Sequence, residues 1–138
     1  MRRTILRVRL SWNLLQAEEE AEAAVLRLEA LNELALSLAA TAQAAAAEAE
    51  AAAEASEDAR TAAKRAALES ALEQQGSRER ADSLLQLSES AMRASNEAEA
   101  ALIRAQEAQL RADDAAAETE AASVEAERAL ERAFRLSQ

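Results

Sequence analysis

The sequence predicts a mainly α protein in which two long helices pair as an antiparallel, alanine-rich coiled-coil hairpin, with a short N-terminal strand. Three observations lead to this prediction. Alanine recurs at alternating steps of three and four residues through most of the 138-residue chain. The chain contains no proline and one glycine, so that little interrupts a helix. Its first residues follow a different period from the rest.

The alanine repeat marks one face of each helix, which we call the seam. A sustained seven-residue repeat is typical of helices that supercoil around one another. Small side chains on both partners predict that the helix backbones approach closely. The predicted interface residues are Leu28, Leu31, Ala35, Leu38, Ala42, Ala45, Ala49 and Ala52 in the first half, and Ala91, Ala94, Ala98, Ala101, Ala105, Ala108, Ala112 and Ala115 in the second half.

The only glycine, Gly76, lies near the middle of the helical region. Glycine is favoured just after a helix ends, and Ser77 is a good N-cap for the helix that follows. The predicted organisation is a basic, strand-like segment at 1–12, a long helix at 13–75, a turn at 76–77 and a second long helix at 78–138. One continuous helix through Gly76 is the alternative, because a glycine inside a helix costs only about 1 kcal/mol.

The segment before Asn13 alternates apolar and polar residues with a period of two, which favours a half-buried strand. Asn13 is a suitable N-cap for a helix that starts after the strand. A helical alternative also fits, since Ile5, Val8, Trp12 and Leu15 step by three and four. A lone strand must pair with another copy or with a partner, so this segment is expected to anchor an assembly. The predicted anchoring residues are Arg7, Val8, Arg9, Leu10 and Trp12.

The composition argues against catalysis and against a metal site. The chain has no cysteine, histidine or tyrosine, which removes the commonest general base and the commonest transition-metal ligand. Three acidic clusters, at 18–20, 57–58 and 113–114, lack the spacing of a calcium loop and are interpreted as solvated helix faces. We therefore predict no enzyme activity, no cofactor and no metal.

Net charge and hydropathy limit the classes of partner that the sequence predicts. The net charge of −10 disfavours nucleic acid, because an acidic surface repels phosphate. No apolar stretch approaches the roughly 20 residues of a membrane span, so a membrane role is not favoured. The N-terminus is interpreted as mature sequence, since Arg7 and Arg9 interrupt the apolar region that a secretory signal needs. One remaining alternative places the arginine-rich segment on a membrane surface, with Trp12 at the interface.

Apolar residues beside the seam make a stripe wider than one neighbouring helix covers, which predicts self-association. The function that follows is an elongated structural or assembly protein that self-associates through its seams, such as a component of a virion, tail, secretion apparatus or filament. The alternatives are a coiled-coil adaptor or chaperone that binds a partner helix, and a designed helical assembly. A soluble protein, intracellular or within a viral or secretion assembly, is expected. The heptads are generically similar to those of chemoreceptor hairpins and export-ATPase stalk proteins, and no residue role carries over from either family.

Overall fold

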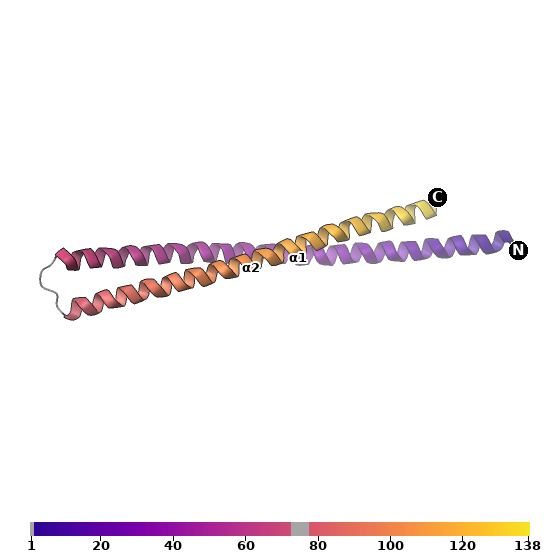
Figure 1. Cartoon of the computed structure of the whole chain (residues 1–138). Coiled ribbons are helices and arrows are strands. Elements are labelled where there is room, and N and C mark those ends of the chain that lie inside the picture. Colours follow the sequence, from indigo (N-terminus) through magenta and orange to yellow (C-terminus); the bar gives the residue numbers. More distant parts are fainter. Residues whose placement is uncertain (1, 73–77) are drawn as a thin grey trace. The chain divides into compact units, whose positions relative to one another are not determined.

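The computed structural model of the chain describes residues 2–72 and 78–138, with side chains given from Arg7 onward. Helix α1 spans Arg2–Leu72 and helix α2 spans Arg78–Ser137, so that Gln138 alone of the described residues is not helical (Figure 1). The prediction of a mainly α chain with two long helices is confirmed. The turn predicted at 76–77 lies outside the described residues.

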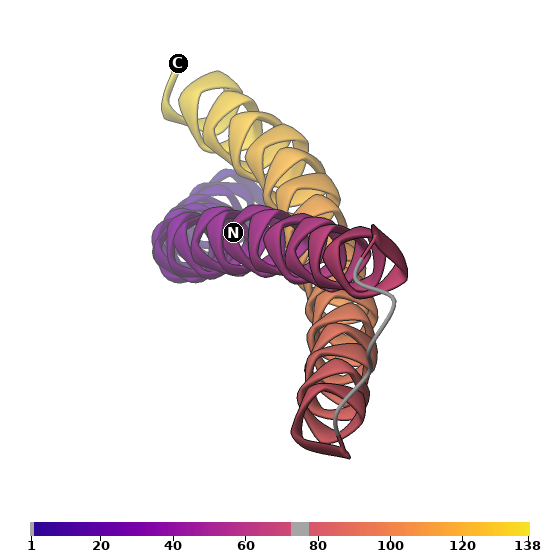
Figure 2. The same cartoon turned by 90° about the vertical axis from the view of Figure 1, so that its left-hand side faces the viewer.

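The chain forms two compact units, each made from one stretch of α1 and one stretch of α2. Unit 1 comprises Met1–Ala39 and Leu110–Gln138, and unit 2 comprises Ala40–Gln109. Both helices continue without a break across the boundary between the units. Figure 2 turns the view by 90°, so that the C-terminal end of α1 and the N-terminal end of α2 face the viewer. The absence of proline explains this continuity, because no residue lacks the N–H that a helix interior needs.

Within each unit the two helices run antiparallel. In unit 1, Arg27 pairs with Glu125, and further along α1 the carbonyl of Leu31 accepts a hydrogen bond from Thr119. Partner numbers on α2 therefore fall as residue numbers on α1 rise. In unit 2, Arg60 donates to the Ser95 hydroxyl at 3.0 Å, and residues 66–70 share an open groove with residues 80–84.

The strand predicted for the N-terminal segment is wrong, because α1 begins at Arg2. The period-two pattern covers only a few residues, and those residues also fit the helical spacing. A helix is favoured over a strand here because it pairs the backbone N–H and C=O groups within the segment, whereas a strand would need a partner strand. Extending a helix that already exists also avoids the cost of nucleation. The Ser11 hydroxyl donates to the Val8 carbonyl at 3.3 Å, a contact within one helical turn.

The predicted helix start at Asn13 is wrong for the same reason. Asn13 lies inside α1 with its side chain exposed, so it caps nothing. The glutamates that follow it do not form the first turn of a helix, and the first turn of α1 has no acidic residue. Glu20 instead accepts a hydrogen bond from Arg132 on α2 and forms an ion pair with it.

The core consists almost entirely of alanine methyl groups. The buried residues of the described part are Ala17, Ala21, Ala42, Ala101, Ala112, Ala115, Ala122 and Ala126, with Ser56 as the buried polar member. Each methyl contributes only about 0.8 kcal/mol, so the pair is stabilised by many small contacts. The Thr119 hydroxyl lies 3.2 Å from the Leu31 carbonyl of the opposite helix and 2.8 Å from its own Ala115 carbonyl. A side chain this short reaches the other backbone only where the helices pack closely.

Candidate functional site

The predicted seam residues lie on the face where α1 and α2 pack in each unit. None of the predicted interface residues is exposed: Ala42, Ala101, Ala112 and Ala115 are buried, and the other members of the set are partly buried. Among the described residues, the burial comes from the chain's own second helix. A role of these residues in contacts between copies stays a prediction.

One side of the seam in unit 1 carries charge, and we call it the charged flank (Glu20, Arg27, Glu125 and Arg132). Each of these residues directly precedes a seam residue. Arg132 Nη1 lies 3.1 Å from Glu20 Oε2, and Arg27 Nη1 lies 3.5 Å from Glu125 Oε2. All four side chains are more than half exposed, so each pair contributes at most about 1 kcal/mol. The two pairs are both made in the same antiparallel register and add little to its stability.

The opposite side of the seam in unit 1 is uncharged along most of its length, with Glu18 in the lining of one of its grooves, and we call it the neutral flank. Its members directly follow seam residues and are Val25, Asn32 and Ala39 on α1 and Ala116, Ser123 and Leu130 on α2. Two open grooves run along it. One, of about 570 Å³, is lined by Asn32, Ala116 and Ser123 together with Leu28 and Ala35 of the seam. The other, of about 350 Å³, lies between Val25 and Leu130.

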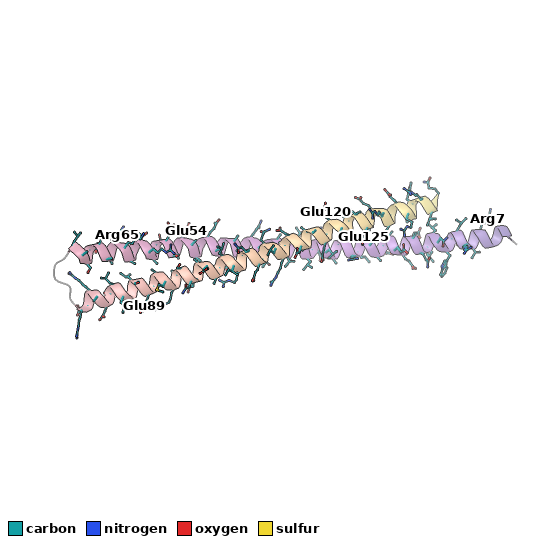
Figure 3. The ribbon with its side chains drawn as sticks, in the orientation of Figure 1. Arg7, Glu54, Arg65, Glu89, Glu120 and Glu125 are labelled. Carbon is teal, nitrogen blue, oxygen red and sulfur yellow. The ribbon has the colours of Figure 1, made fainter. Side chains whose placement is uncertain are left out.

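Glutamates border the neutral flank on both helices, and we call them the acidic rim (Glu22, Glu29, Glu120 and Glu127). Glu29 and Glu120 line the larger groove, and Glu22 lines the smaller one. All four are exposed, and none takes part in the ion pairs found among the described residues. Figure 3 labels Glu120 of the rim and Glu125 of the charged flank on the same stretch of α2.

The N-terminal part of α1, residues 2–13, is the only strongly basic stretch, and we call it the arm. It carries four arginines and no acidic residue, opposite in sign to the net charge of −10. The arm extends past the last described turn of α2 in unit 1, and Arg7 lies near its end (Figure 3). Val8 is 65% exposed and Trp12 is 61% exposed. The predicted anchoring residues therefore lie together on one helix, and all three apolar members, Val8, Leu10 and Trp12, are exposed.

A third groove of unit 1, of about 630 Å³, lies on the charged side and includes Asn13, Glu20, Arg128, Arg132 and Arg135 in its lining. Arg132 is held by Glu20, and Arg135 lies 3.8 Å from Glu131. The polar residues that line this groove are therefore exposed, and none of them is a buried polar group. Across the described ranges, no three acidic side chains gather as a metal site would require.

Comparison with known proteins gave no assignment: no protein-family model, no curated protein and no solved structure matches the chain. No helix of residues 2–72 or 78–138 is both long enough and apolar enough to cross a membrane.

The distinction between the two flanks is the feature that the sequence reasoning missed. Four residues of the neutral flank were recognisable as apolar neighbours of the seam: Val25, Ala39, Ala116 and Leu130. Their separation from the charged flank requires the antiparallel pairing, because only that pairing puts residues following the seam on one side for both helices.

Proposed function

We propose that the chain is a structural or assembly protein, a helical pair of coiled-coil type that associates with other copies of itself. The observation that carries this proposal is the neutral flank. The seam is covered by the chain's own second helix, yet Val25 and Leu130 border an open groove that nothing in unit 1 covers. Exposed apolar surface beside a core that is already packed is typical of an interaction site.

The test is the mass of the purified protein in solution as a function of concentration. Sedimentation equilibrium over a range from about 1 to 200 µM should give a mass above the 14.8 kDa of one chain. The double variant Val25→Glu/Leu130→Glu should lower the association, because a buried unpaired carboxylate is costly. The matched control is Leu68→Glu/Leu85→Glu, which adds the same charges at exposed positions of unit 2. Association that is absent, or equally sensitive to both pairs, contradicts the proposal.

A second candidate function, an adaptor for a helix of another protein, is favoured by one observation. The acidic rim borders an apolar groove, and that combination suits a basic amphipathic helix. A stable monomer across the concentration range would favour this second function over self-association.

A further inference from the structure

We infer that the arm of a second copy of this chain docks on the neutral flank of unit 1, and that the acidic rim recognises the arginines of that arm. This inference rests on the proposed self-association and names the segment and the surface that meet.

The first support is the chemistry of the arm. Val8 and Trp12 of the arm and Leu15 just after it follow one another at steps of four and three, so they share a face of α1, and all three are at least half exposed. Such a face fits the way helices dock in apolar grooves, through anchors at i, i+4 and i+7. Trp12 is the chain's only tryptophan, the residue type most enriched at binding hot spots.

The second support is charge. Two neutral flanks packed face to face would bring four acidic edges together, and two arms packed together would bring like-charged arginines together. Both arrangements are disfavoured by repulsion. An arm on a neutral flank instead places Arg7 and Arg9 next to Glu29 and Glu120, which are exposed and border the groove. Charge therefore favours the unlike pairing over either like pairing.

The third support is geometry. The arm cannot fold back onto the flank of its own copy, since α1 is one continuous helix from Arg2 to Leu72. An arm that occupies the flank must therefore come from another copy. At 1.5 Å per residue the arm is about 18 Å long, which is shorter than the stretch of α1 that lines the two grooves. Reciprocal docking gives a closed two-fold dimer, and one-way docking gives a growing row of copies.

The experiment is a charge swap, measured by sedimentation equilibrium on the full chain. The arm variant is Arg7→Glu/Arg9→Glu, and the rim variant is Glu29→Lys/Glu120→Lys. Each alone should raise the dissociation constant at least about tenfold, because each places like charges in contact. The quadruple variant, which combines the arm variant with the rim variant, should recover most of the wild-type affinity. The control Glu54→Lys/Glu107→Lys makes the same charge change at exposed positions of unit 2, one on each helix, and should leave the affinity within about twofold.

Trp12→Ala tests the apolar half of the interface, with Leu68→Ala as its control, since Leu68 is equally exposed at 66%. Trp12→Ala should weaken association at least about tenfold and Leu68→Ala should have little effect. Circular dichroism must show the same helix content in every variant, which separates a lost contact from a lost fold.

The outcomes distinguish this inference from the proposed function. A wild-type chain that stays monomeric overturns both. Association that survives Trp12→Ala and the arm variant overturns the inference and leaves self-association intact. A quadruple variant that does not recover the wild-type affinity also overturns the inference. A monomeric chain that binds phosphatidylglycerol vesicles through the arm overturns it in favour of a membrane surface.

Discussion

The alanine seam makes a quantitative prediction at Ala42, which is 3% exposed on the face where α1 packs on α2. Ala42→Leu adds a branched side chain where the helices already pack closely, and overpacking of this kind costs about 1–3 kcal/mol. Ala44→Leu is the matched control, because Ala44 lies on the same helix with its side chain exposed. Leucine and alanine have similar helix propensities, so the control should change stability by only a few tenths of a kcal/mol.

A glycine pair at the same two positions gives a second, independent magnitude. Ala44→Gly should cost about 1 kcal/mol from helix propensity alone. Ala42→Gly should cost that amount plus about 0.8 kcal/mol for the buried methyl group. Urea unfolding followed by circular dichroism at 222 nm measures all four variants. Equal effects at Ala42 and Ala44, for either substitution, would refute the assignment of Ala42 to a packed seam.

Three further predictions follow from individual contacts. Thr119→Val should destabilise unit 1 by about 0.5–1.5 kcal/mol, because the hydroxyl that reaches the Leu31 carbonyl is lost, and urea unfolding should show Thr119→Ser to be milder. A double-mutant cycle with Glu20→Gln and Arg132→Gln should give a coupling of about 0.2–1 kcal/mol that falls in 1 M salt; a coupling that salt leaves unchanged would contradict an exposed pair. Val8→Pro should remove helical chemical shifts only around and before residue 8, since proline breaks a helix locally, whereas strand-like shifts there in the wild type would restore the rejected prediction.

The helices and the seam could be predicted because both depend on local information. Period 3.5 fixes which residues share a face, and the lack of proline permits long helices. Ala42 and Ala101 were accordingly assigned to the seam and are buried. Their burial was predictable from the repeat and from the expectation that the two helices pair.

The N-terminal segment shows where local patterns fail. Alternation over Leu10 and Trp12 is compatible with two periods, and so short a window cannot separate them. The decision depends on whether a partner strand exists, which is not a local property. An N-cap residue such as Asn13 is also common inside helices when its side chain points to solvent, so the capping signal added no independent support.

The flanks and their ion pairs depend on register, which the sequence does not give directly. Arg27 and Glu125 are far apart in the chain, and only the antiparallel alignment makes them neighbours. The same alignment places Val25 and Leu130 around one groove that Glu18 and Glu22 border. The register of α1 against α2 therefore had to come from the structure. It replaced a general expectation of self-association with a defined surface, the neutral flank.

The central claim is that the seam of α1 is occupied by α2 of the same chain in antiparallel register, and disulfide formation tests it most directly. The chain has no cysteine, so Leu31→Cys/Thr119→Cys introduces a single possible pair at positions that already share a hydrogen bond. On mild oxidation at low concentration, mass spectrometry and a non-reducing gel should show an internal disulfide within one chain. The control pair Ala17→Cys/Ala112→Cys, at seam positions out of register, should not close. Cross-linking of the first pair only between chains, or equal closure of both pairs, would contradict the claim.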